Sequence, residues 1–260
     1  MAGSLYSNTG AKRAREARDG LGCEQGPLRD VMEVIEEHGG VQVVVLELAQ
    51  SVAGAYIAKS DLPLVFVNGS QAITRQRFTL AHEFGHFRMG HSSVVDRQVT
   101  IGGVQRDPNE VAANAFAAEF LMPKEATKRW ARENVDGQVT LEQVVVFACE
   151  YGVSPQAARY AFATAGVLTD EERAAHLDAE IAEELHIELA SYLGLEPLED
   201  RLAEAVRRMP RIPPPLERSA LGELLVGAID IAELAARTGR TEPEVEEALA
   251  EFHLDQLLPA

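Results

Sequence analysis

The sequence predicts an α+β fold, in which a small antiparallel sheet packs on one helix and is followed by a helix-turn-helix and further all-helical C-terminal segments. Three observations predict this fold. Apolar, β-branched runs, which are typical of strands, lie at residues 41–48, 53–59 and 62–68. The next stretch, from Arg75 to His91, has apolar residues at helical spacing. From residue 107 onward, the capping signals and the periodicity are almost entirely those of helices.

The composition is that of a soluble globular chain. It has 260 residues, of which 46% are hydrophobic, enough for one sizeable core and a smaller domain. No apolar run has the length of a membrane span, and the first residues contain no apolar segment of the secretory type. We therefore expect a cytoplasmic protein with no membrane partner.

The formal net charge of −17 disfavours broad contact with nucleic acid, because neutralising phosphates requires Lys and Arg on the contacting face. The charge is uneven, with basic residues before residue 20 and acidic residues at 170–200 and 242–251. Solvated helix faces are the simpler interpretation of both groups. Direct DNA binding is therefore disfavoured, and the oligomeric state is left open.

One motif in the chain carries chemistry. His82, Glu83 and His86 have the order H-E-x-x-H. On a helix, the two histidines lie about 40° apart around the axis and one turn apart along it, so they can hold one ion. Glu83 then points along the edge of that face, where its carboxylate could take a proton from water without binding the metal. This is the arrangement of a zincin-like, zinc-dependent peptidase.

The cysteines do not offer a metal site of their own. Cys23 and Cys149 are too few and too far apart in sequence to suggest a disulfide framework or a thiolate site. A metal ion would then be held by histidine and carboxylate side chains.

A catalytic zinc site needs a third protein ligand. The metzincin spacing is excluded, because Met89 and Ser92 stand where that class has Gly and His. His91 follows the end of the helix and would have to fold back onto the ion. Glu110 and Glu119 lie on the next helix, nine residues apart and about 180° around its axis, so only one of them can face the histidines.

Glu110 is the preferred third ligand, with Glu119 and His91 as alternatives. Asn114 lies one turn after Glu110 on the same helix face. A metal-binding histidine usually donates its other ring N–H to a carboxylate or carbonyl oxygen, and the Asn114 side chain could accept this bond from His82. In thermolysin-like zincins, the helix after H-E-x-x-H divides these two roles within E-x-x-x-D, where this chain has Asn in place of Asp.

The segments RQRFTLAHEFGHFRMGH and NEVAANAFAAEFLMP together resemble the motifs of the ImmA/IrrE family of metallopeptidases. The family patterns are R-F-x-x-A-H-E-x-G-H and E-x-x-A-N-x-F-A-x-x-L-L-M-P, and Phe120 stands where Leu is usual. The matching residues are Arg77, Phe78, Ala81, His82, Glu83, Gly85, His86, Glu110, Ala113, Asn114, Phe116, Ala117, Leu121, Met122 and Pro123. The resemblance covers roughly residues 28–166.

The resemblance implies a metallopeptidase whose protein substrate is a helix-turn-helix repressor of the Xre type. Cleavage of the repressor would release stress, phage or mobile-element genes. The residues implied as metal ligands are His82, His86 and Glu110. They would hold Zn²⁺, although this ligand set also accepts Mn²⁺ or Fe²⁺, and Glu83 would be the catalytic base.

Several features of the mechanism stay open at this point. Candidates for stabilising an oxyanion are Tyr56, Arg75 and Arg77, each with a structural alternative. The strand that ends near Asn68 could bind an extended substrate by edge pairing. The chain could also be a non-enzymatic regulator whose helix-turn-helix units bind DNA or a partner, or one half of a toxin–antitoxin pair.

The organisation expected from these signals has six parts. They are a flexible basic N-terminus (1–27), a zincin-like metallopeptidase domain (28–135), a helix-turn-helix (136–168), an acidic helical segment (169–208), a Pro-rich linker (209–217) and a C-terminal helical module that resembles a second helix-turn-helix (218–260).

Overall fold

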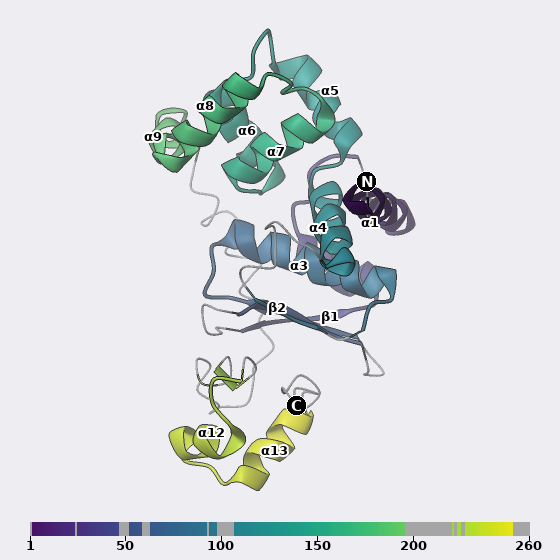
Figure 1. The fold of residues 1–260 in the computed structure, drawn as a ribbon, viewed down its shortest axis with the longest axis vertical. Helices are drawn as coiled ribbons and strands as arrows, with labels where there is room; N and C mark the ends of the chain where they lie inside the picture. Colours follow the sequence, from purple (N-terminus) through teal and green to yellow (C-terminus); the bar gives the residue numbers. More distant parts are fainter. Residues whose placement is uncertain are drawn as a thin grey trace.

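The computed structural model describes residues 2–23, 25–46, 52–58, 63–92, 94–97, 107–195, 220, 223–224 and 227–251. Its architecture confirms the α+β class, with a small sheet below helix α3 and helices on both sides of it (Figure 1). Within the described part of the chain, no helix combines the length and the apolar character needed to cross a membrane.

The described part of the sheet contains four strands. They are β1 (Gln42–Leu46), β2 (Val52–Ile57), β3 (Leu64–Asn68) and β4 (Val94–Arg97). Their spatial order is β1-β3-β2-β4. β3 pairs antiparallel with β2 but parallel with β1, and β2 pairs antiparallel with β4. The sheet is therefore mixed and not antiparallel throughout, because β1 and β3 run parallel to each other.

Two expectations about the strands need correction. β3 has a neighbour on each side, so the strand that ends at Asn68 has no free edge for a substrate. The three strands expected from the sequence do not include β4, which takes an outer position in the sheet. Its four residues are too short a run for periodicity to reveal a strand.

Helix α3 (Ile73–Met89) lies between the sheet and helix α4 (Pro108–Leu121). Phe84 of α3 is fully buried and packs against the rings of Phe116 and Phe120 on α4, with ring centroids 5.9 and 5.6 Å apart. Because α3 has the sheet on one side and α4 on the other, its polar side chains must find partners inside the protein.

The N-terminal segment is not the flexible tail expected for residues 1–27. Helix α1 (Ala2–Gly20) packs along α4 (Figure 1). Its Arg18 is buried and donates hydrogen bonds to the carbonyl oxygens of Phe120 and Gly26, both at 2.6 Å. The expectation was wrong because basic residues usually mark a solvated face, whereas this guanidinium donates to one carbonyl at the end of α4 and to one in the loop that follows α1.

A short helical segment lies between α1 and the sheet. It consists of α2 (Val31–Glu33) and the π-helix η1 (Val34–His38). The Asp30 side chain accepts a hydrogen bond from the Glu33 N–H at 2.9 Å, as a helix N-cap does. This cap explains why the helix begins after Asp30.

The part of the chain from Lys124 to Tyr192 forms a group of helices at one end of the molecule (Figure 1). They are α5 (Lys124–Asn134), α6 (Leu141–Tyr151), α7 (Pro155–Ala165), α8 (Glu171–Ala182) and α9 (Leu185–Tyr192). α6 and α7 form the expected helix pair, with Ser154 as the N-cap of α7. A DNA-binding use of this pair stays an alternative hypothesis, which the net charge disfavours. The described part of the acidic helical segment expected from residue 169 is divided into α8 and α9 at Glu184, whose φ is 60°.

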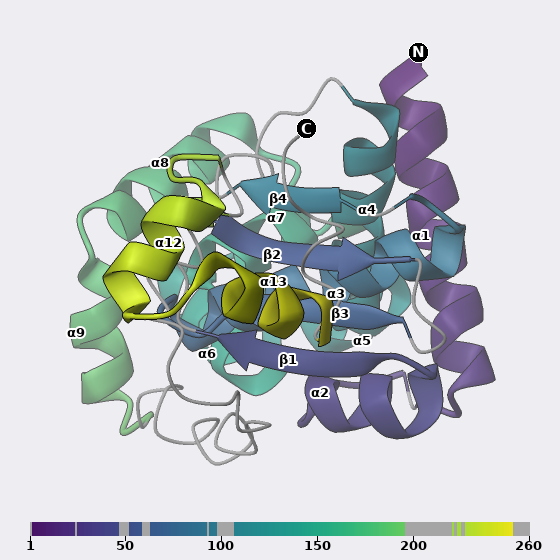
Figure 2. The same ribbon diagram turned by 90° about the horizontal axis from the view of Figure 1, so that it is seen from below.

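The C-terminal helices cover the sheet on the face opposite α3 (Figure 2). They are α12 (Ile231–Thr238) and α13 (Glu242–Glu251). Leu234 and Val245 are fully buried and cluster with Val52 and Phe66 of the sheet. The pair thus contributes directly to a second apolar core. The Pro-rich linker expected at 209–217 lies outside the described residues.

The packing of this second core can be tested at Leu234. Leu234→Ala is expected to lower the free energy of unfolding by about 2–5 kcal/mol, because it leaves a cavity in a closed apolar cluster. Leu5 is 64% exposed, so Leu5→Ala is a matched control that should change stability by less than about 0.5 kcal/mol. Urea denaturation measures both values. Equal, small losses in the two variants would contradict the packing of α12 on the sheet.

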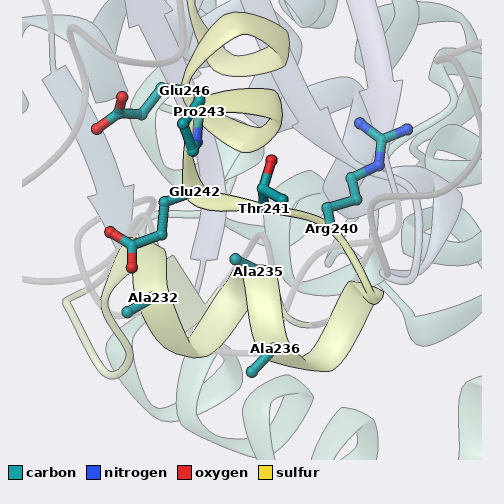
Figure 3. A pocket seen from close by; sticks show the side chains of 8 residues that line it. All are labelled: Ala232, Ala235, Ala236, Arg240, Thr241, Glu242, Pro243 and Glu246. Carbon is teal, nitrogen blue, oxygen red and sulfur yellow. The ribbon is translucent and has the colours of Figure 1, made fainter.

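A hollow of about 600 Å³ lies between α12 and α13 (Figure 3). It is lined by Ala232, Ala235, Ala236, Arg240, Thr241, Glu242, Pro243 and Glu246. The lining combines small apolar side chains with charged ones and includes no residue of the H-E-x-x-H motif. This hollow therefore belongs to the C-terminal helix pair and not to the site described next.

Candidate metal centre

Two helices bring three potential metal ligands together. His82 and His86 lie one turn apart on α3, and Glu110 lies in the first turn of α4, which packs against α3. The Glu110 carboxylate oxygens lie 3.3 Å from Nε2 of His82 and 3.4 Å from Nε2 of His86. The two Nε2 atoms are 3.1 Å apart. All three side chains are buried, and together they could hold one metal ion.

The donor atoms of this group fit a divalent cation. The Asn114 Oδ1 lies 3.1 Å from Nδ1 of His82. An amide oxygen can only accept, so the proton of the neutral imidazole is on Nδ1 and Nε2 presents a lone pair to Glu110. The Oε2 atom of Glu110 is buried and accepts no hydrogen bond from any described residue. Acceptors that face each other at this distance repel, and a cation bound by two histidines and one glutamate relieves the repulsion.

Asn114 should therefore influence metal affinity without binding the metal. Asn114→Ala is expected to weaken Zn²⁺ binding about 10- to 100-fold, because His82 loses the acceptor that fixes its ring. Titration against a chelator of known affinity measures this change. Asn114→Asp keeps the acceptor and adds a charge, so it should bind Zn²⁺ at least as tightly as the wild type. If Asn114→Ala and the wild type bind equally, Asn114 does not have this role.

Glu83 follows His82 directly in α3 but does not belong to the metal group. Its side chain is fully buried, on the side of α3 that faces β2. A methyl group at Gly54 of β2 would lie 2.8 Å from Glu83 Oε1 and 2.5 Å from Cγ2 of Thr79. Only glycine at position 54 leaves room for the carboxylate against the strand. We did not anticipate this contact, although a glycine inside an apolar strand run is the signal that could have indicated it.

His91 contacts a candidate ligand but is not part of the metal group. It follows Gly90, which ends α3, and its Nδ1 lies 2.9 Å from Nδ1 of His86. This is the His86 ring nitrogen that does not face Glu110. Burial lowers the pKa of His91 below its ordinary value, while the carboxylates of Glu110 and Asp107 act in the opposite direction.

Glu119, the other candidate on α4, faces a different part of the protein. Its Oε1 accepts a hydrogen bond from Arg15 of α1 at 3.0 Å, and its Oε2 accepts one from the backbone N–H of Lys124 at 3.3 Å. These contacts agree with the half-turn that separates positions 110 and 119 around the helix axis. Glu119 thus joins α4 to its neighbours and lies outside the metal group.

Two of the oxyanion candidates lie on the elements that form the site or pack against it, Tyr56 on β2 and Arg75 on α3. Tyr56, on β2, belongs to the main apolar core, and its ring centroid is 6.1 Å from that of Phe87. Burial raises the pKa of the Tyr56 hydroxyl. Arg75 is half-buried at the start of α3, where burial lowers its pKa. An oxyanion-stabilising role for either residue stays a prediction.

Arg77, the third oxyanion candidate, is engaged in the fold. Its buried guanidinium donates to the carbonyl oxygens of Leu28 at 2.6 Å, Arg29 at 2.8 Å and Gly152 at 2.9 Å. Burial lowers the pKa of Arg77 to about 10, which still leaves it charged at neutral pH. The side chain therefore ties α3 to the segment before α2 and to the turn between α6 and α7.

Removal of the Arg77 guanidinium should destabilise the protein strongly. Arg77→Met is expected to lower the free energy of unfolding by about 3 kcal/mol or more, because three backbone carbonyls lose their donor. Arg132 is exposed, and Arg132→Met, the matched control, should change stability by less than about 0.5 kcal/mol. Denaturant unfolding compares the two variants. A loss in Arg77→Met no larger than in the control would show that these hydrogen bonds contribute little.

The comparison with protein families identifies the segment that carries this site. Residues 36–163 match the peptidase M78 model, described as the IrrE N-terminal-like domain. This segment belongs to the ImmA/IrrE family. The resemblance inferred from the two motifs is thereby confirmed, and the match includes all four described strands, α3 and α4. A comparison with curated proteins found no match to the chain. The ImmA/IrrE segment excludes α1 and the pair α12–α13.

Proposed function

We propose that the protein is a zinc-dependent metalloendopeptidase that cleaves a helix-turn-helix repressor of the Xre type and so derepresses stress, phage or mobile-element genes. One observation supports the peptidase most strongly. His82, His86 and Glu110 converge in a buried group, and the adjacent residue Glu83 is fully buried, with its carboxylate against Gly54 of β2. Two histidines and one glutamate are a known ligand set of catalytic zinc. The repressor as substrate is inferred from the ImmA/IrrE family, and with such a substrate we expect the reaction to occur in the cytoplasm.

Each residue of the site has a defined task in this mechanism. His82, His86 and Glu110 would hold the ion, which would supply Lewis-acid chemistry at the scissile carbonyl and at the attacking water. Glu83 takes a proton from the attacking water and passes it to the leaving amine. Its burial against β2 restricts the orientation of the carboxylate, so little reorganisation is needed when the proton moves. Asn114 keeps the Nε2 lone pair of His82 directed towards Glu110.

The proposed binding surface for the substrate backbone is strand β4. It pairs with β2 on one side, and no other described strand lies on its other side. The unpaired N–H and C=O groups of an outer strand can bind an extended peptide as an additional strand. This replaces the strand that ends at Asn68, whose two edges are both occupied.

Direct DNA binding is not part of the proposal. In α7, the second helix of the predicted helix-turn-helix, Arg159 forms an ion pair with Asp178 of α8 at 2.6 Å. In α13, the exposed residues include Glu242, Glu244 and Glu246, which the phosphates of DNA would repel. Nanomolar, sequence-dependent retardation of DNA at physiological salt would instead favour a regulator, or one half of a toxin–antitoxin pair.

The proposal is tested by incubating the zinc-loaded protein with a purified Xre-type repressor encoded nearby. Unfolded casein serves as a generic substrate, and a chelator is added to parallel samples. Mass spectrometry should reveal two repressor fragments, formed only without the chelator. Cleavage of casein alone would retain the peptidase but remove the repressor as its substrate. No cleavage of either protein would contradict the peptidase itself.

A further inference from the structure

The connection after α3 returns His91 to the H-E-x-x-H motif. Gly90 has a φ of 71°, a left-handed conformation that glycine adopts without steric cost. The backbone N–H of His91 then donates to the carbonyl oxygen of His86 at 3.0 Å. This turn reverses the chain within one residue and brings the His91 side chain back along α3.

The two imidazole rings meet through their Nδ1 atoms. These atoms are 2.9 Å apart. The ring centroids are 4.9 Å apart, and the ring planes meet edge to face at 70°. One nitrogen must donate and the other must accept, because two lone pairs would repel at this distance. Nε2 of His86 faces the Glu110 carboxylate and the Nε2 of His82. If this Nε2 is to bind a cation, the proton of His86 is on Nδ1, and His91 is the acceptor.

The same relation exists on the other histidine of the motif. His82 has its Nε2 towards Glu110 and its Nδ1 towards the Asn114 amide oxygen. Each candidate ligand on α3 therefore has a separate acceptor behind it, one from α4 and one from the chain after α3. His91 lies outside the group that could hold the ion, and it contacts the candidate ligand His86 through the ring nitrogen that does not face Glu110.

We propose that His91 is a positioning residue of the metal centre, which accepts the Nδ1–H of His86 and so directs the Nε2 lone pair of His86 towards the ion. The proposal rests on the metallopeptidase function inferred above. Partners behind a metal-binding histidine fix the ring and its tautomer, and their removal typically costs about 10- to 100-fold in metal affinity. Loss of His91 is expected to have an effect of this size.

The test compares three variants of the full chain with the wild type. His91→Leu removes the acceptor. His91→Asn restores one, because the asparagine side-chain oxygen can occupy roughly the place of the histidine Nδ1. His176→Leu is the matched control, since His176 is an exposed histidine on α8, outside the metal group. Zinc affinity is measured by competition with a chelator, and the thermal stability of each metal-free protein is measured separately.

His91→Leu should bind zinc about 10- to 100-fold more weakly, while His91→Asn recovers most of the affinity and His176→Leu equals the wild type. The visible absorption spectrum of the Co²⁺-substituted proteins should change for His91→Leu and return towards the wild-type form for His91→Asn. Both readouts are independent of peptide cleavage.

Three results would overturn the proposal. They are an unchanged zinc affinity in His91→Leu, no recovery in His91→Asn, and an affinity loss fully matched by lower stability of the metal-free protein. If the wild type itself binds no zinc, the metallopeptidase function fails. If the wild type binds zinc and His91→Leu binds it equally well, only the role of His91 fails.

Discussion

The Glu83→Gln variant is expected to cleave substrate about 10²- to 10⁴-fold more slowly than the wild type while binding zinc equally well. Glutamine nearly matches glutamate in shape, so it should fit the same space against Gly54 and Thr79. It cannot take a proton from water, however, so the proposed base is removed without disturbing the ligands. The kcat for repressor or casein cleavage measures the first effect, and elemental analysis of the purified variant measures the second.

A second buried carboxylate offers the control for this substitution. Glu119 is also buried, and its contacts are with Arg15 and Lys124. Glu119→Gln should therefore retain the peptidase activity of the wild type. If Glu83→Gln and Glu119→Gln cleave at similar rates, Glu83 is not the catalytic base.

Glu110→Ala is expected to lower the zinc affinity by more than about 100-fold. Loss of a residue that only hydrogen-bonds to a metal ligand typically costs about 10- to 100-fold in affinity, and Glu110 is itself a proposed ligand. The substitution removes both oxygens that face His82 and His86. The two histidines remain, but a catalytic zinc site needs three protein ligands. Isothermal titration of the metal-free protein with Zn²⁺ measures the change.

Glu119→Ala is the matched substitution on the same helix. It should leave zinc binding unchanged and destabilise the contact between α1 and α4, which the Arg15 ion pair supports. If Glu119→Ala lost zinc and Glu110→Ala retained it, the choice between the two faces of α4 would be wrong.

The geometry of the candidate site could be predicted because local spacing determines it. His82 and His86 lie one helical turn apart wherever α3 is placed, and the half-turn between Glu110 and Glu119 leaves only one of them facing the histidines. Asn114 supported the choice of Glu110, because it lies on the same face one turn later. The structure brings His82 Nδ1 and Asn114 Oδ1 to 3.1 Å.

Other features could not be predicted because they depend on contacts between distant parts of the chain. Arg18 is buried because its guanidinium meets carbonyls of Phe120 and Gly26, and its own neighbours in sequence give no sign of this. The position of β3 between β1 and β2 follows from packing and not from periodicity. His91 was considered as a ligand because histidine commonly binds metal ions. The turn at Gly90 instead places its Nδ1 next to Nδ1 of His86, on the side of that ring away from Glu110.

Both ends of the chain add to the core of the ImmA/IrrE segment. α1 packs along α4 from outside the matched residues 36–163, and α12 and α13 cover the face of the sheet opposite α3 (Figures 1 and 2). Buried residues such as Ala14, Ala17 and Leu234 therefore complete apolar cores that the matched segment only begins. The full chain, and not residues 36–163 alone, is the appropriate protein for every experiment described above.

Anomalous diffraction from crystals of the full chain grown with zinc, recorded on both sides of the zinc absorption edge, tests the metal centre most directly. One strong peak is expected between His82, His86 and Glu110, about 2.0–2.2 Å from each Nε2 and from the nearest carboxylate oxygen. Stoichiometrically bound zinc at any other place, or crystals with no peak among these three side chains, would contradict a zinc-dependent peptidase centred on the H-E-x-x-H motif.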